Sequence, residues 1–190
     1  MRLKEVIDNL NRSSNNDFSR PLLESIVAPE VQSALKKWIK NAKDSGVLIG
    51  GLALSFHGKP RQTMDVDVAY ITPNEIPGNV PGFKRIRQHS YMDLDTHVEI
   101  EVLDPQFMKV PPNLVKKVRD TAINSNGMKV ASKSGVVAIK LGRAERENNL
   151  QDQADIQHLI KTGNVDVSEF KDVLTSGQIN LFNKIYHSTL

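Results

Sequence analysis

The clearest alternation of hydrophobic and polar positions lies in residues 47–71, with the sequence VLIGGLALSFHGKPRQTMDVDVAYI. It opens with a short apolar run, which predicts a buried strand that ends at Gly50-Gly51. Residues 52–57 then predict a short helix, and residues 65–71 predict a second strand. In this second strand Asp65 and Asp67 alternate with valines, so both carboxylates should point to one face, about 7 Å apart.

The rest of the chain alternates helical and strand patterns around this unit. Helical spacing of apolar residues predicts helices at residues 2–10, 29 or 30 to about 44, 113–123, 134 to about 147 with Ser134 as N-cap, 150–162 and, once or twice, within 165–190. Strand patterns lie at residues 83–88, 97–103 and 128–131, with 92–96 as a polar connection, and Pro and Gly predict a loop at 72–82. Trp38 falls on the apolar stripe of the second helix and is expected in the core.

These elements predict an α/β (α+β) protein with a small mixed sheet flanked by helices. A chain of 190 residues suits one domain that is long enough to bury a core. We expect a single domain over residues 1–190, with a catalytic α/β core at about 25–110 and a mainly helical part at 111–190.

Composition narrows the chemistry. The absence of cysteine excludes disulfides, thiolate metal sites and a cysteine nucleophile, and it fits a reducing cytoplasm. The first residues carry several charges, and nowhere do 18 apolar residues follow one another, so neither a signal peptide nor a membrane span is expected. The sequence therefore predicts a cytoplasmic protein without a membrane partner.

Charge is unevenly distributed, although the net charge is only +3. Residues 91–104 hold five acids and no Lys or Arg, whereas residues 105–146 hold nine Lys or Arg against Asp120 and Glu145. An acidic strand beside a basic half suits a polyanionic ligand such as a nucleoside triphosphate, a nucleic acid or both. Solvated helix faces would explain many of the same lysines.

Asp65 and Asp67 have the spacing of metal ligands, and an acidic strand further along offers a partner. In residues 97–103 the alternation places Glu99 and Glu101 on one face, and this strand should lie beside Asp65 and Asp67. An ordinary tight turn at the glycines and a solvated edge strand would also explain the pattern. However, VDVAYI is as apolar as a strand inside a sheet, where unpaired carboxylates are costly without a cation.

The stretch GGLALSFHGKPRQTMDVD, with Arg61 and Thr63 just before the two aspartates, resembles the signature of the nucleotidyltransferase superfamily of the DNA polymerase β type. It is most similar to the minimal nucleotidyltransferases of the bacterial abortive-infection and toxin–antitoxin type. A second segment, VVAIKLGRAERENNLQDQADIQHLI, resembles the block that follows the catalytic strands in these proteins. The resemblance covers about residues 47–160 and implies the nucleotidyltransferase fold.

The resemblance implies a set of site residues. Asp65, Asp67 and Glu101 would be the catalytic ligands of Mg²⁺ or Mn²⁺, with Glu99 as the alternative third ligand, although Asp is more usual there. The predicted nucleotide-binding residues are Gly50, Gly51, Arg61, Thr63 and Lys140. The glycines would leave backbone N–H groups free for phosphate at a helix start. Lys140 lies in an apolar helical run, so it should either reach out to solvent or meet an anion.

The second segment also carries Arg143, Arg146, Asp152 and Asp155. The two aspartates are three residues apart on one helix, so they are expected to cap or to pair with Arg143 or Arg146 rather than to bind metal.

The implied reaction transfers a nucleoside monophosphate from an NTP substrate to an acceptor hydroxyl and releases pyrophosphate. The acceptor could be tRNA or another nucleic acid, a protein or a small molecule, and the protein could be toxin-like or related to phage defence, with an antitoxin protein as partner. Two alternatives stay open: a non-catalytic nucleotide- or RNA-binding or antitoxin-like module, and a Mg²⁺-dependent phosphodiesterase or nuclease. The glycine pair favours a triphosphate substrate over the nuclease.

Overall fold

A computed structural model describes residues 27–44, 46–59 and 63–189 of the protein. The helix expected at residues 2–10 and the candidate nucleotide ligand Arg61 lie outside the described residues. Among the described residues, no helix is long and apolar enough to cross a membrane.

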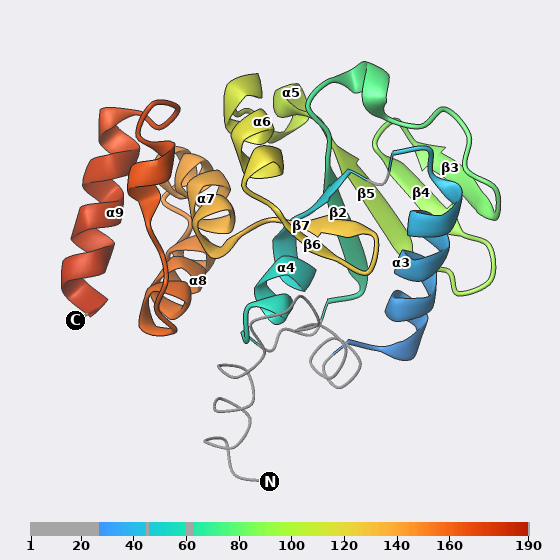
Figure 1. The fold of residues 1–190 in the computed structure, drawn as a ribbon, viewed down its shortest axis with the longest axis horizontal. Coiled ribbons are helices and arrows are strands. Elements are labelled where there is room, and N and C mark those ends of the chain that lie inside the picture. Colours follow the sequence, from blue (N-terminus) through green and yellow to red (C-terminus); the bar gives the residue numbers. More distant parts are fainter. Residues whose placement is uncertain (1–26, 45, 60–62, 190) are drawn as a thin grey trace, which may run out of the picture.

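The described chain is a mixed α/β structure, as the sequence predicts (Figure 1). Its helices are α3 (Pro29–Asn41), α4 (Gly50–Phe56), α5 (Pro105–Met108), α6 (Pro112–Asp120), α7 (Lys133–Glu147), α8 (Leu150–Lys161) and α9 (Ser176–Thr189), with short 3-10 turns η1 (Pro73–Glu75) and η2 (Val167–Phe170). Its strands are β1 (Val47–Leu48), β2 (Asp65–Ala69), β3 (Phe83–Arg87), β4 (Ser90–Asp93), β5 (Glu99–Leu103), β6 (Ile123–Ser125) and β7 (Met128–Val130).

The strands form one seven-stranded mixed sheet in the order β3-β4-β5-β2-β1-β7-β6. Strands β2 and β5 are parallel neighbours near its middle, which confirms the prediction that the strand within residues 97–103 lies beside Asp65 and Asp67. Strand β7 pairs with β1, so the sheet also draws on residues beyond 110, within the part expected to be mainly helical. The sheet therefore joins the two halves of the chain around β1 and β2.

Strand β4 is the main element that the sequence interpretation missed. Residues 92–96 were expected to be a polar connection, yet β4 runs to Asp93 and pairs with both β3 and β5. Asp93 can be buried there because Lys37 of α3 donates to its carboxylate at 2.7 Å. An aspartate that looked like a loop residue is thus a strand residue whose charge is paired by a distant helix.

The start of α7 also differs from the expectation. Ser132, not Ser134, is the N-cap, and its hydroxyl accepts a hydrogen bond from the backbone N–H of Gly135 at 3.1 Å. The hydroxyl of Ser134 instead accepts from the N–H of Asp166 at 2.9 Å. Both serines satisfy backbone donors, and only the structure separates their roles.

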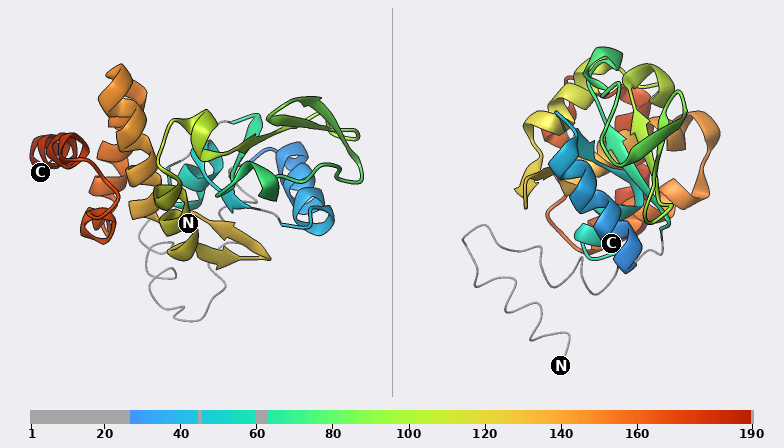
Figure 2. Two further views of the ribbon diagram at one scale, coloured as in Figure 1. Left: turned by 90° about the horizontal axis from the view of Figure 1, so that it is seen from above. Right: turned by 90° about the vertical axis from the view of Figure 1, so that its right-hand side faces the viewer.

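The core lies between the sheet and its covering helices. Trp38 of α3 is fully buried, as predicted, with edge contacts to Phe83 and Tyr91 at ring-centroid distances of 5.2 and 5.3 Å. Figure 2 shows α3 near one end of the molecule and α7, α8 and α9 grouped at the other. Of these C-terminal helices, α7 packs against α4 and α6, and the pocket described next lies between α7 and the sheet.

Candidate functional site

A cavity of about 450 Å³ lies between β2, β5 and the turn into α4 on one side and α5 and α7 on the other. Its strand side carries Asp65, Asp67 and Glu101. The parallel register sets Asp67 beside Glu101 and Asp65 beside Glu99. Glu99 is not among the pocket residues, and it accepts a hydrogen bond from the Ser90 hydroxyl. The structure therefore brings the first-choice glutamate, not the alternative, into the pocket.

Two of these carboxyl groups, Asp67 and Glu101, have raised pKa values. Burial, followed by the negative charges of Asp65 and Glu101, raises the pKa of Asp67 to about 6. Burial and the charges of Asp65 and Glu99 likewise raise the pKa of Glu101. Among the described residues, Asp65, Asp67 and Glu101 have no ion-pair partner. This wall of the pocket therefore concentrates negative charge that the described chain does not neutralise.

The glycine pair fits closely against these carboxylates. Gly50 has a φ of 62°, and a Cβ on it would lie 1.7 Å from Oδ2 of Asp67. The backbone N–H of Gly51 acts on the same carboxylate and lowers its pKa, against the larger effect of burial. Thr63 donates its hydroxyl to Asp65, and a Cβ on Gly51 would lie 3.1 Å from the Thr63 side chain. The glycines therefore permit the close approach of β2, and one of the N–H groups expected to face phosphate instead faces Asp67.

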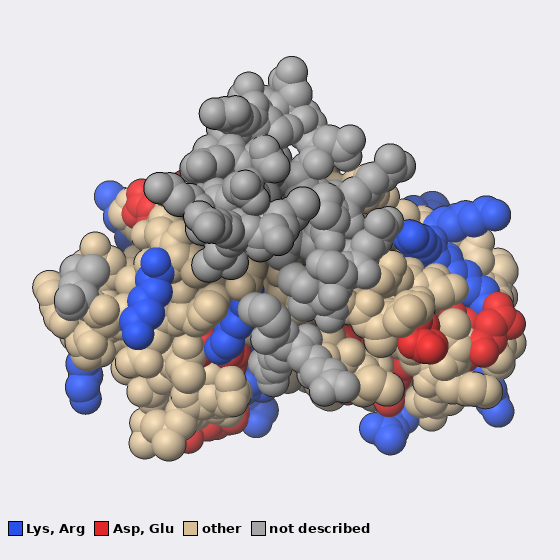
Figure 3. Space-filling view, turned by 90° about the horizontal axis from the view of Figure 1, so that it is seen from below, with Lys and Arg blue, Asp and Glu red and all other residues tan. Residues whose placement is uncertain are grey.

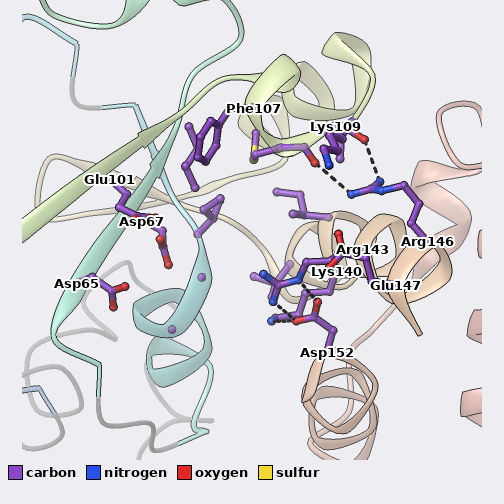
Figure 4. Close-up of a pocket in the computed structure, with 18 of the residues that line it drawn as sticks. Asp65, Asp67, Glu101, Phe107, Lys109, Lys140, Arg143, Arg146, Glu147 and Asp152 are labelled. Atoms are coloured by element: carbon purple, nitrogen blue, oxygen red, sulfur yellow. Dashed lines mark hydrogen bonds and ion pairs between the residues drawn. The ribbon is translucent and has the colours of Figure 1, made fainter. Parts of the chain in front are cut away.

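The helix side of the pocket is basic and internally paired (Figure 4). Lys140 of α7 is only 8% exposed, and its ammonium group lies 2.6 Å from Oδ1 of Asp152 and 2.8 Å from Oδ2 of Asp155, both on α8. Lys59, just after α4, also pairs with Asp155. The expectation that Lys140 meets an anion is thus met by two aspartates of the chain itself.

Arg143 lies one helical turn after Lys140 and pairs with the same aspartate. Its Nε and one Nη donate to the two carboxylate oxygens of Asp152, while half of its side chain stays exposed. Burial opposes the charge on Asp152, but the hydrogen bonds from Arg143 and Lys140 outweigh it, so the pKa of Asp152 is lowered. The predicted pairing of Asp152 with an arginine of this segment is confirmed for Arg143.

Arg146 does something else. Its two Nη atoms donate to the backbone carbonyls of Lys109 and Met108 at 2.9 and 3.3 Å, so it fastens the end of α5 to α7. Of the two arginines named as alternative partners, only Arg143 pairs with an aspartate of α8 among the described residues.

The pocket thus gathers six of the predicted site residues on its strand and turn side, together with Lys140 opposite. They are Gly50, Gly51, Thr63, Asp65, Asp67 and Glu101. The sequence interpretation did not predict that Phe107 and Met108 of α5 line the pocket. It also assigned no ligand-binding role to Arg143, which lines the pocket as well. Helical spacing from Lys140 could have revealed Arg143, but no sequence signal pointed to Phe107.

A preformed metal cage is not found in the described part of the chain, where no three His, Asp or Glu side chains are grouped closely enough to hold a cation alone. Mg²⁺ typically needs only one or two carboxylates, since waters and substrate phosphates complete its shell. Asp65 and Asp67, with unpaired oxygens facing the pocket, are the pair that suits such an arrangement.

Basic residues elsewhere on the surface are mostly interspersed with acids. Lys116 pairs with Asp120, and Lys117 pairs with Asp172. Figure 3 shows Lys and Arg side chains at both ends of one face, with Asp and Glu beside them. Ion pairs with acidic residues therefore neutralise part of the positive charge of residues 105–146.

Comparisons with known proteins add little to this geometry. No protein-family profile matches the chain. Trehalose phosphorylases from Pleurotus pulmonarius and Pleurotus sajor-caju are 29% identical to it over 89 residues. The match covers 47% of this chain but only 12% and 11% of those two proteins, so the chain spans a small part of their length. The likeness is to one part of each enzyme and assigns no activity here.

Proposed function

We propose that the protein is a metal-dependent nucleotidyltransferase of the nucleotidyltransferase fold, transferring a nucleoside monophosphate from an NTP to an acceptor hydroxyl. The observation that carries the proposal is the meeting of Asp65, Asp67 and Glu101, from two paired strands, in one pocket faced by Lys140 and Arg143. A negative wall and a positive wall on either side of one cavity suit a ligand that brings both a divalent cation and a polyphosphate.

The acidic wall fits Mg²⁺ or Mn²⁺ by its chemistry, because carboxylate oxygens are the ligands that these cations prefer. Asp65 and Asp67 would hold the cation, with Glu101 beside Asp67. When bound, the cation would neutralise phosphate charge and lower the pKa of a coordinated hydroxyl. Its charge would also relieve the repulsion that raises the pKa of Asp67.

The basic wall would hold the leaving group. Arg143 uses Nε and one Nη on Asp152, and its other Nη has no partner among the described residues, so it can donate to a phosphate oxygen. Lys140 keeps a third N–H beyond the two aspartates that it pairs with. Asp152 would hold the side chains of Lys140 and Arg143 at the pocket wall, where negative charge develops on the departing pyrophosphate.

The chemical step then needs an acceptor oxygen in line with the α-phosphate. That oxygen forms a bond to the α-phosphorus, the bond to the β-phosphate bridging oxygen breaks, and pyrophosphate leaves. Glu101, whose pKa is raised by burial and by neighbouring acids, is a stronger base than an ordinary glutamate and would take up the acceptor proton.

Label transfer tests the proposal. The protein is incubated with each NTP labelled at the α- or the γ-phosphate, Mg²⁺ or Mn²⁺, and total tRNA, total RNA or a lysate as acceptor. We expect α-label on an acceptor, no γ-label on it, and loss of transfer by at least about a hundred-fold in Asp65→Asn and Asp67→Asn. Asp120→Asn, which alters an exposed acid far from the pocket residues, serves as the matched control.

Three results would replace the proposal. Transfer of γ-label would indicate a kinase, and shortening of the RNA without NTP would indicate a nuclease. A parallel incubation with trehalose and inorganic phosphate covers the activity named for the partial relatives. Conversion of trehalose in the absence of NTP would show that the protein catalyses a different reaction.

A further inference from the structure

We infer that Phe107 is the stacking platform for the base of the bound nucleotide, an inference that rests on the proposed function. Phe107 lines the same cavity as Asp67 and Lys140, yet 54% of the residue is exposed. Single exposed apolar side chains are common on protein surfaces, but this ring lines the rim of the pocket, where a bound ligand could contact it. Its place on the rim separates it from the charged walls (Figure 4).

The ring is backed by a second ring. His89 lies on one side of Phe107, with ring centroids 4.5 Å apart and an angle of 36° between the planes. The His89 side chain is itself largely buried, and its Nδ1 lies 3.2 Å from the carbonyl oxygen of Val102 on β5. Because one side of Phe107 is occupied in this way, the exposed area is left for a planar group to contact.

The backbone around Phe107 is held at both ends. Asp104 caps α5 by accepting a hydrogen bond from the N–H of Phe107 at 2.8 Å. Two residues later Lys109 ends the helix with a φ of 54°, and Arg146 of α7 donates to its carbonyl. A ring carried on such a fixed turn loses little freedom when a base stacks on it, so stacking would add affinity efficiently.

The neighbours of Phe107 distinguish a base subsite from a phosphate subsite. Leu103, Met108, Val110 and Ile139 also line the pocket, so apolar side chains surround Phe107. Lys109 and Arg146 lie at the end of α5, and the carboxylates of Asp65 and Asp67 lie on β2. A nucleotide has the same division, with a flat, weakly polar base at one end and charged phosphates at the other. The cavity of about 450 Å³ lies within the ordinary range for small-ligand sites, roughly 300–1,000 Å³.

Binding of two ligands that differ only in the presence of a nucleoside tests the inference. Dissociation constants for ATP and for inorganic tripolyphosphate, each with Mg²⁺, are measured by calorimetry on the full chain. Stacking on an aromatic side chain contributes about 1–3 kcal/mol per base, so Phe107→Ala should weaken ATP binding about 5- to 150-fold. Tripolyphosphate binding should not change, because that ligand has no base.

Further variants keep the test sharp. Phe107→Tyr should retain ATP binding and Phe107→Leu should lose it, since leucine keeps apolar bulk but has no ring; this variant also decides the matter if Phe107→Ala folds poorly. Tyr186→Ala removes a comparably exposed aromatic ring from α9, outside the pocket, and should change neither ligand.

The outcomes separate the two claims. If the wild type binds both ligands and the Phe107 variants weaken both equally or neither, the base subsite is wrong while the triphosphate site stands. If the wild type binds neither ligand, the proposed function itself fails, and the base subsite fails with it.

Discussion

On the strand side of the pocket three carboxylates, those of Asp65, Asp67 and Glu101, have no ion-pair partner among the described residues. On the helix side, by contrast, the buried carboxylates of α8 are each held by two cations. Burial acts on both groups in the same direction, raising the pKa of a carboxyl. Yet the pKa of Asp67 rises to about 6, whereas that of Asp152 is lowered, because only Asp152 has cations that outweigh the cost of burial.

The difference separates a charge cluster that is matched inside the fold from one that the described chain leaves unmatched. The helix-side cluster stabilises itself, since its charges are matched inside the fold. On the strand side, by contrast, burial and neighbouring negative charges disfavour the charged form of Asp67, and under the proposed function a divalent cation would relieve this repulsion. Charge alone does not mark a functional site, but charge that the fold leaves unmatched in a cavity is a better indicator.

Removing Lys140 should have the largest effect on stability. Lys140→Ala would leave Asp152 and Asp155 each with one cation fewer in a buried setting, and we expect a loss of about 3 kcal/mol in the free energy of unfolding. Lys116→Ala, which breaks an exposed pair with Asp120, should cost no more than about 0.5 kcal/mol. Denaturant titration of both variants measures the difference, and equal small losses would mean that the helix-side cluster is not structural.

The second-largest effect on stability is expected from a substitution that crowds Asp67. Gly50→Ala would force an L residue to a φ of 62° and place its Cβ against Asp67, whereas Gly58→Ala would be strained at a φ of 87° but would meet no atom within 4 Å. The backbone strain costs about 1–2 kcal/mol in each. We expect Gly50→Ala to be less stable than Gly58→Ala by about 2 kcal/mol in thermal denaturation, because Asp67 and β2 must also shift. Similar losses would show that the close fit of the turn has little energetic weight.

Neutralising Asp67 should have a smaller effect, and one of opposite sign. The folded-state pKa of about 6 lies above the ordinary 3.8, so the charged form is penalised fully above pH 6 and the penalty disappears as the pH falls below about 4. Asp67→Asn should therefore raise the free energy of unfolding by about 1–2 kcal/mol at pH 7.5 and by almost nothing at pH 3.5. Chemical denaturation at the two pH values checks this, and a loss of stability at pH 7.5 would show that the Asp67 carboxylate is structural.

The positions of the strand-side carboxylates could largely be predicted from the sequence. The ion pairs of the helix side could not. Strand alternation alone put Asp65 and Asp67 on one face and predicted a neighbouring acidic strand. The choice of Glu101 over Glu99 needed the resemblance, because the two share a face, and the structure places only Glu101 among the pocket residues. Local periodicity determines such features, so they can be read without tertiary information.

The partners of Lys140 could not be predicted in the same way. The apolar run showed that Lys140 needs an anion, but Asp152 and Asp155 reach it only because α7 ends at Asn148, at a φ of 45°, and α8 turns back along it. The location of Phe107 depends likewise on the α5 turn and on Arg146 of a helix that is distant in sequence. These contacts are set by tertiary packing, which a single sequence does not reveal.

The most direct test of the unmatched acidic wall is cation binding itself. We would follow free Mn²⁺ by electron paramagnetic resonance while titrating it into the wild type, the double variant Asp65→Asn/Asp67→Asn, and Asp120→Asn as a surface control. We expect the wild type and Asp120→Asn to bind Mn²⁺ equally, and the double variant to bind it at least about ten-fold more weakly, since two carboxylate ligands are lost. Equal binding by all three proteins would contradict the assignment of Asp65 and Asp67 as the cation site.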